Sequence, residues 1–271
     1  MKKLISAVLA LSLALSLAAC AGNPSSESQS TAEESSSVAT DSSEDATAET
    51  GATGEVLSYD EYMAADVDTL VTVEAYVQAK QSYYAEQSTA TVYAQDEDGA
   101  YFFYDMACSE EDYEKLTPGT CIRVTGYKTI WSGEIELMEA TFEFVEGADT
   151  FVATPLDVTD LLGTEELIDH QNQLVSFTGL TVAPSTDANG EEAAFLYGWD
   201  GSGTEGDDLY FNVSYNGETY TFLVESYLCD STTEVYSAVK NLEIGQTIDA
   251  EGFLYWYEGV NPHITSVTVA E

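Results

Sequence analysis

The chain has 271 residues, and its 49 acidic residues outnumber its 7 Lys and Arg residues so far that the formal net charge at pH 7 is −42. A surface this acidic repels nucleic-acid phosphates and anionic lipid headgroups, and it suits solubility, cation binding or a neutral or basic partner. We therefore expect nucleic acid to be an unlikely partner.

The first segment of the chain has the pattern of an export signal. Lys2 and Lys3 precede an apolar run over residues 4–17, which is too short for a mature transmembrane helix. The run ends in the sequence LAAC, whose last residue is Cys20, and this ending resembles the lipobox of bacterial lipoproteins. The resemblance implies a signal peptide over residues 1–20 and lipidation of Cys20. It also implies a location on the extracytoplasmic face of the cell membrane, as in exported lipoproteins of Gram-positive bacteria.

Residues 21–54 have the composition of a disordered linker. They consist mainly of Ser, Thr, Ala, Glu and Gly and hold no large apolar side chain. Such a segment cannot bury enough surface to offset the entropy of ordering. We expect an acidic tether between the signal peptide and a folded part.

From Glu55 onward, Tyr, Phe, Val and Leu become frequent and are separated by Gly turns. Ser109 is a good N-cap for a helix that Pro118-Gly119 would end. The elements expected in the first half are a short helix over 59–65, strands over 70–79, 89–95 and 100–106, a helix over 109–116, and strands over 121–130 and 135–145. Three strands, a helix and two strands in this order are typical of the five-stranded OB barrel.

The second half of the chain repeats the glycine spacing of the first. The segment LVTVEA at 70–75 also matches LVSFTG at 174–179. The second unit carries extra residues in its middle, which we expect around 199–208 and in a longer helical stretch over 232–242. The matched glycine pairs are Gly119 with Gly245, Gly126 with Gly252, and Gly133 with Gly259.

Asn216-Gly217 separates two alternating runs and predicts a tight β-hairpin. Leu209, Phe211 and Val213 share one face of its first strand, and we expect that face to be core. Helical turns are expected over 155–162 and 165–170. The sequence thus predicts an all-β protein with short helices, in which two tandem OB-fold-like five-stranded barrels, over residues 55–150 and 151–271, follow the signal peptide and the linker.

Three cysteines remain besides Cys20, namely Cys108, Cys121 and Cys229. A disulfide is permitted outside the cytoplasm, and Cys108 with Cys121 is the natural pair because the two residues bracket a predicted helix. The alternative is three buried thiols that behave as small apolar side chains. The spacing does not resemble a zinc site.

The sequence lacks the motifs of common enzymes, such as a nucleophile elbow, a phosphate loop or a metalloprotease helix. His170 and His263 lie in different halves of the chain, and neither has a Cys or His nearby. His263 is interpreted as a turn residue with local hydrogen bonds or, alternatively, as a base or a ligand-binding group. We expect a protein that is not an enzyme. An enzyme or enzyme accessory that uses His263 and nearby acids in a cleft between the domains is the alternative.

Aromatic residues are the best signal for a ligand, because the chain holds 18 Tyr and 3 Trp. OB folds bind ligands over their second and third strands and the adjoining loops, where aromatic rings stack on bases or sugars. The residues expected to contact a ligand are Trp131, Trp199, Tyr255, Trp256, Tyr257 and His263. The alternative is that these rings only pack the barrel ends and the contact between the domains.

Residues 200–208 form a glycine-rich acidic loop with the sequence DGSGTEGDD. The spacing does not match an EF-hand, so we expect a solvated loop in a protein without a cofactor. The alternative is a Ca²⁺ site, because carboxylate, hydroxyl and carbonyl oxygens are the ligands that Ca²⁺ prefers, and Asp200, Asp207 and Asp208 would then be the metal ligands.

Together these patterns predict a lipid-anchored protein that acts as a non-catalytic binding or interaction module for a protein, a peptide or a glycan. A carbohydrate- or cell-wall-binding protein that uses the exposed aromatic residues is one alternative. The enzyme or enzyme accessory described above is the other. The sequence does not identify the ligand, because OB barrels carry many unrelated functions.

Overall fold

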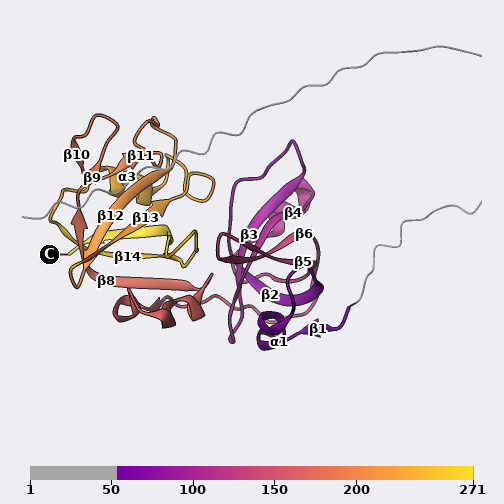
Figure 1. Ribbon diagram of the computed structural model, residues 1–271. Coiled ribbons are helices and arrows are strands. Elements are labelled where there is room, and N and C mark those ends of the chain that lie inside the picture. Colours follow the sequence, from indigo (N-terminus) through magenta and orange to yellow (C-terminus); the bar gives the residue numbers. More distant parts are fainter. Residues whose placement is uncertain (1–53, 271) are drawn as a thin grey trace, which may run out of the picture. The chain divides into compact units, whose positions relative to one another are not determined.

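Two closed barrels of five strands each make up the fold (Figure 1). The computed structural model describes residues 54–270. The helices in this range are short, and none of them is long and apolar enough to cross a membrane. The prediction of an all-β protein with two tandem OB-like barrels is confirmed.

The first barrel follows the predicted order of elements. Strand β2 pairs with β3, β3 with β4, β4 with β6, β6 with β5, and β5 again with β2, which closes the barrel. The contact between β4 and β6 is parallel, and the others are antiparallel. The elements are β1 (Val56–Leu57), α1 (Tyr59–Ala64), β2 (Leu70–Lys80), β3 (Thr89–Gln95), β4 (Ala100–Ala107), α2 (Glu110–Lys115), β5 (Cys121–Trp131) and β6 (Glu134–Phe144).

Local sequence signals explain these elements. Side chains alternate along β2, so that Val71, Val73 and Val77 are buried in the core of the first barrel. Ser58 and Ser109 cap α1 and α2, because each side chain accepts a hydrogen bond from the backbone N–H three residues further on.

The second barrel has the same topology. Strands β8, β12, β13, β15 and β14 are neighbours in that order, and the pairing of β8 with both β12 and β14 closes the barrel. The predicted hairpin forms between β12 and β13. The elements are β7 (Leu156–Asp157), η1 (Thr159–Leu161), η2 (Glu165–His170), β8 (Leu174–Ala183), β9 (Ser185–Thr186), β10 (Glu192–Ala193), β11 (Leu196–Tyr197), β12 (Leu209–Tyr215), β13 (Glu218–Val224), α3 (Glu234–Lys240), β14 (Thr247–Phe253) and β15 (His263–Val269).

The extra residues of the second unit lie in the two connections where they are expected. Residues 184–208 join β8 to β12, whereas residues 81–88 join the equivalent strands β2 and β3. Residues 225–246, which include α3, join β13 to β14, whereas residues 108–120 join β4 to β5. The insertion at 184–208 forms the short strands β9, β10 and β11.

Matched glycines have the same physical role in both barrels. Gly119 and Gly245 each have a φ of 88°, which side chains other than glycine rarely adopt. A Cβ atom added to Gly252 would lie 2.2 Å from the carbonyl oxygen of His263, and one added to Gly126 would lie 2.8 Å from the Cβ of Ala140. Both positions therefore need glycine, because the neighbouring strand approaches too closely.

The barrels contact each other through aromatic side chains. Tyr93 of β3 and Phe102 of β4 are buried together with Phe253 of β14. The rings of Tyr93 and Phe253 stack with their centroids 4.3 Å apart. Glu134, the first residue of β6, accepts a hydrogen bond from the backbone N–H of Trp256 at 2.9 Å. The described residues all fall in one compact unit, so the limits of the two domains stay a prediction.

Cys108, Cys121 and Cys229 are free thiols, and all three are buried. The structure therefore contains the three separate thiols given above as the alternative, and the predicted disulfide is not formed. Burial raises the pKa of Cys108 and the pKa of Cys229 to about 11, so both thiols stay protonated at neutral pH.

Candidate ligand-binding site between the barrels

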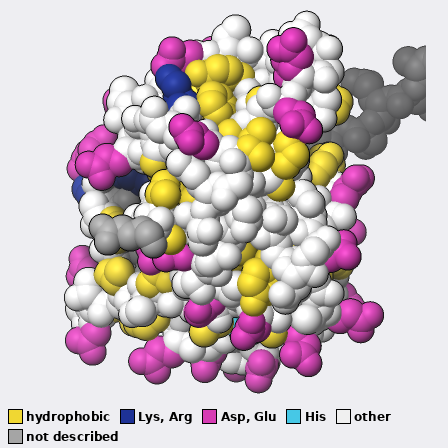
Figure 2. All heavy atoms as spheres, turned by 90° about the vertical axis from the view of Figure 1, so that its left-hand side faces the viewer, with side chains coloured by type: hydrophobic (Ala, Val, Ile, Leu, Met, Phe, Trp, Pro, Cys, Tyr) yellow, Lys and Arg dark blue, Asp and Glu magenta, His cyan; other side chains and the backbone are white. Residues whose placement is uncertain are grey.

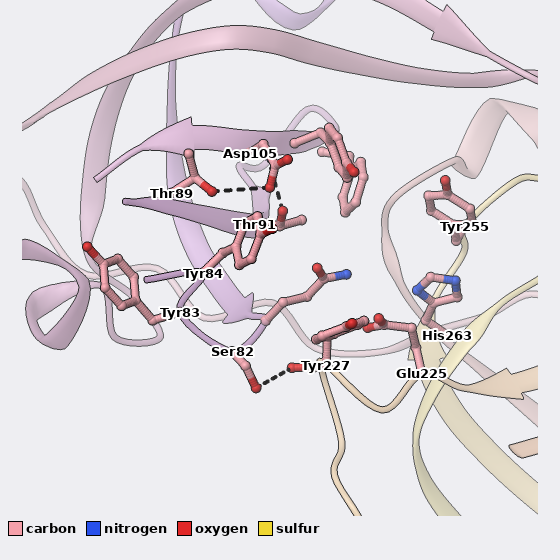
Figure 3. A pocket seen from close by; sticks show the side chains of 13 residues that line it. Ser82, Tyr83, Tyr84, Thr89, Thr91, Asp105, Glu225, Tyr227, Tyr255 and His263 are labelled. Atoms are coloured by element: carbon pink, nitrogen blue, oxygen red, sulfur yellow. Dashed lines mark hydrogen bonds between the residues drawn. The ribbon is translucent and has the colours of Figure 1, made fainter. Parts of the chain in front are cut away.

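A pocket lies between the barrels, over the strands with which OB folds bind their ligands (Figure 3). Its volume is about 460 Å³, which is in the usual range for small-molecule pockets. We call it the interbarrel pocket. Its lining residues are Gln81, Ser82, Tyr83, Tyr84, Thr89, Thr91, Phe102, Tyr104 and Asp105 from the first barrel, and Glu225, Tyr227, Tyr255 and His263 from the second.

Asp105 reaches the pocket from a bulge in β4. The pairing of β3 with β4 shifts register between Ala90 and Val92, and Asp105 on the opposite strand has a φ of 45°. A bulge of this kind re-aims a side chain. The Asp105 Oδ1 accepts a hydrogen bond from Thr89 Oγ1 at 3.3 Å, and the Asp105 N–H donates to Thr91 Oγ1 at 3.1 Å (Figure 3).

Glu225 brings a buried carboxylate to the pocket from the end of β13. Only 8% of this residue is exposed, and among the described residues its Oε2 has no hydrogen-bond partner. Burial, reinforced by the charge of Asp208, raises the pKa of Glu225 to about 7, although the backbone N–H groups of Tyr227 and Leu228 act in the opposite direction. A positive group in the pocket would pair with this carboxylate and lower its pKa.

His263 and Tyr255 form an aromatic wall of the pocket. Their rings stack with centroids 4.3 Å apart, and His263 Nδ1 forms a hydrogen bond of 2.6 Å with the hydroxyl of Tyr93. Burial lowers the pKa of His263 to about 3, so the imidazole is neutral at physiological pH. The interpretation of His263 as a turn residue with local hydrogen bonds is wrong, because its partner lies on the other barrel.

Tyr227 closes part of the pocket and is held there by the first barrel. Its carbonyl oxygen accepts hydrogen bonds from the Ser82 N–H at 2.7 Å and from the Ser82 hydroxyl at 3.1 Å (Figure 3). Both barrels therefore contribute to one fixed cavity.

Basic side chains do not line this pocket within residues 54–270. The five Lys and Arg residues of that range are all engaged elsewhere. Lys115 contacts Glu111 and Asp112, Arg123 contacts Glu74 and Glu143, Lys240 contacts Glu205, Lys80 contacts the carbonyl of Tyr113, and Lys128 contacts carbonyl groups at the end of α1. Figure 2 accordingly shows a face with many acidic and few basic side chains.

The structure brings together two of the six residues predicted to contact a ligand. Tyr255 and His263 line the interbarrel pocket. The ring of Trp256 instead packs beside Gly133, the turn glycine of the β5–β6 hairpin. The remaining three, Trp131, Trp199 and Tyr257, are exposed and lie outside this pocket.

Three carboxylates of the acidic loop at 200–208 accept hydrogen bonds from backbone N–H groups. Asp200 accepts from the Ser202 N–H, Asp207 accepts from the Thr204 N–H, and Asp208 accepts from the Ser226 N–H. No group of three or more His, Cys, Asp or Glu side chains within residues 54–270 is arranged to hold a metal ion. The Ca²⁺ site at Asp200, Asp207 and Asp208 stays a prediction.

Sequence reasoning missed Asp105 and Glu225. Asp105 is one of 49 acidic residues, and the sequence around it does not predict the bulge that turns its side chain toward the pocket. Glu225 directly follows the alternating run of β13, where alternation puts it on the face opposite the barrel core. That signal indicates a surface position, whereas in the structure Glu225 is buried and lines a pocket together with residues of the first barrel.

The signal peptide, the lipidation of Cys20 and most of the acidic linker lie outside the described residues. The extracytoplasmic location, which depends on them, stays a prediction.

No protein-family model matches the chain, and no curated protein matches it. Solved structures with a similar arrangement include a HINb domain, with 11% identity and a TM-score of 0.33 over 76% of this chain and 100% of the other. The Ifi202 HINa domain in complex with 20bp dsDNA has 12% identity and a TM-score of 0.33, covering 74% of this chain and 97% of the other. A Replication Protein A heterotrimer bound to ssDNA has 11% identity and a TM-score of 0.29, covering 74% of this chain and 49% of the other.

These comparisons correct two predictions. Two of these structures contain bound DNA, and this finding contradicts both the membrane-anchored binding module, with its carbohydrate-binding alternative, and the expectation that nucleic acid is an unlikely partner. Net charge is an average over the whole chain, so it does not fix the ligand of one local surface. At these TM-scores the similar structures assign no ligand to this chain.

Proposed function

We propose that the chain is a binding protein that holds a small organic cation, such as a primary amine or a quaternary ammonium, in the interbarrel pocket. The observation that carries this proposal is the Glu225 carboxylate, which is buried among aromatic rings while its Oε2 lacks a partner within the described residues. A buried carboxylate needs a partner, and a cationic ligand supplies one.

The aromatic walls favour the same class of ligand. Phe102, Tyr104 and Tyr255 line the pocket, and the faces of such rings attract a cation placed within about 6 Å of the ring centre. Asp105 adds a second carboxylate on the opposite side, from the first barrel. Rings and carboxylates together discriminate a cation from a neutral molecule of the same shape.

The size of the pocket favours a small molecule. The second barrel covers much of the face made by β3 and β4, because Tyr93 and Phe102 pack against Phe253. What remains is the volume of about 460 Å³ between the barrels. This volume accommodates a compact ligand whose charged group points to Glu225.

The histidine of the pocket belongs to its wall. His263 is neutral and its Nδ1 is already hydrogen-bonded to Tyr93, so it acts as part of the wall. The acids remain available to bind a cation, as the pKa of Glu225 near 7 leaves a large share of this carboxylate ionised at neutral pH.

Calorimetric titration of the full chain with choline and with dimethylbutanol, its neutral isostere, tests the proposal. We expect one choline per chain and at least ~10-fold weaker binding of the isostere, since a desolvated cation–π contact contributes about 2 kcal/mol. A short single-stranded oligonucleotide is titrated in parallel, because similar structures are bound to DNA.

Two variants locate the binding. Glu225→Gln keeps the shape of the side chain and should weaken choline binding by ~10-fold or more, because it removes the carboxylate charge that attracts the quaternary ammonium, and 10-fold corresponds to about 1.4 kcal/mol. Glu218→Gln removes an exposed carboxylate from the same strand and should leave binding unchanged. Equal affinity for choline and its isostere, or tight binding of the oligonucleotide alone, contradicts the proposal.

A further inference from the structure

A second recess adjoins the interbarrel pocket and is formed by the insertion of the second barrel. Its volume is about 380 Å³, and we call it the distal recess. Trp199, which is 77% exposed, and Tyr210 contribute aromatic surface to it. Its acidic lining residues are Asp200, Asp207 and Asp208.

The two recesses share Tyr227 as a lining residue. A hydrogen bond also connects the two recesses. Asp208 of the distal recess accepts it from the N–H of Ser226, which is the neighbour of Glu225 in the chain. The charge of Asp208 also acts on the carboxyl of Glu225. Two negatively charged recesses thus lie on either side of one tyrosine, and no basic residue within 54–270 lines either of them.

We infer that the ligand is a linear polyamine that spans both recesses. One ammonium group lies at Glu225 in the interbarrel pocket, the alkyl chain passes Tyr227, and a second ammonium group lies at Asp208 beside Trp199. This inference rests on the proposed function and names the ligand class for the same site.

The chemistry of the junction fits such a ligand. An alkyl chain is apolar and packs on aromatic rings, while each ammonium donates hydrogen bonds to carboxylates. Acidic residues alone would not define a site, but the buried Glu225 Oε2 without a partner among the described residues marks one end of it. Once the first ammonium is bound, the second encounters the distal recess at a high effective concentration, so affinity should depend on chain length.

Titration of the full chain with a series of diamines, from putrescine to diaminododecane, tests this inference. The monoamines of matching length and spermine are titrated in the same way. We expect monoamines to bind and the longer diamines to bind at least ~10-fold more tightly than monoamines of equal length. Trp199→Ala should remove this gain while leaving monoamine affinity unchanged. Asp208→Asn also changes the charge beside Glu225, so it is judged by the ratio of diamine to monoamine affinity, which should fall to about 1. Trp131→Ala, which removes an exposed indole outside both recesses, is the matched control. It should change neither the affinity for monoamines nor the gain in affinity of the diamines.

The outcomes separate the inference from the proposed function. If monoamines and diamines bind equally at every length, the polyamine inference is wrong and the cation pocket stands. If the gain from the second amine survives both distal variants, it comes from the general acidity of the surface, and the inference is also wrong. If neither class binds, the proposed function itself fails.

Discussion

Replacing Glu134 by Gln should stabilise the protein at neutral and alkaline pH. Glu134 is fully buried where the two barrels meet, and its Oε2 accepts the Trp256 N–H. Its Oε1 and the Oδ1 of Asn172 both lack hydrogen-bond partners within the described residues, and the Asn172 side chain lies within hydrogen-bonding reach. A Gln side chain keeps the acceptor for Trp256 and adds an N–H₂ donor for Asn172.

The magnitude follows from the pKa of Glu134. Burial raises this pKa from 4.5 to about 8, so that between these values the folded state keeps a proton that the unfolded state releases. The free energy of unfolding therefore falls by about 1.4 kcal/mol per pH unit as pH rises through this window, and it levels off above the folded pKa. The loss is on the order of 5 kcal/mol in total. Glu134→Gln does not lose this free energy of unfolding, because glutamine does not titrate. The variant should therefore become increasingly more stable than the wild type as pH rises.

Urea unfolding between about pH 5 and pH 8 measures this difference. The difference in unfolding free energy between Glu134→Gln and the wild type should rise by about 1.4 kcal/mol per pH unit across this range. Glu251→Gln, which replaces an exposed glutamate on β14, should run parallel to the wild type. A Glu134→Gln curve that is also parallel to the wild type, or that lies below it at pH 8, would refute the reasoning.

Four further predictions follow from single residues. Lys128→Met should destabilise the protein by about 3 kcal/mol in urea unfolding, because the Lys128 Nζ donates to three carbonyl groups at the end of α1; an unchanged midpoint would contradict this role. Choline affinity should increase as pH rises through the Glu225 pKa of about 7, and calorimetry at constant ionic strength should find this trend abolished in Glu225→Gln. Gly252→Ala should lower Tm more than Gly126→Ala, since its Cβ would meet a backbone carbonyl oxygen at 2.2 Å, and the reverse order in calorimetric scans would contradict the packing argument. Metabolic labelling with a fatty acid should be lost in Cys20→Ser, and labelling that persists would exclude Cys20 as the lipidation site.

The barrels could be predicted from the sequence because their signals are local. The alternating runs on either side of Asn216-Gly217 and the turn between them act over a few residues, and the structure has the β12–β13 hairpin at those positions. Ser109 caps α2 as expected. The repeated glycines allowed the barrel predicted for the first half to be predicted for the second half as well. The close approach of neighbouring strands needs glycine at the same place in each barrel.

The site could be predicted only in part because it depends on how the barrels pack. The sequence predicted Tyr255 and His263 as residues that contact a ligand, and both line the interbarrel pocket in the structure. Glu225 and Asp105 were missed, because burial by another barrel and a shift in strand register leave no local signal in one sequence. Trp131 was predicted as a ligand-binding residue on the same grounds, but it is exposed and lies outside the pocket.

Backbone-amide NMR of the full chain during a choline titration tests the central claim most directly. We expect shift changes to concentrate at residues around Glu225, Tyr227 and Tyr255 and at the facing bulge around Asp105. These changes should saturate with one choline per chain and disappear in Glu225→Gln. Shift changes spread over the acidic surface, or identical changes in Glu225→Gln, would contradict a cation site between the barrels.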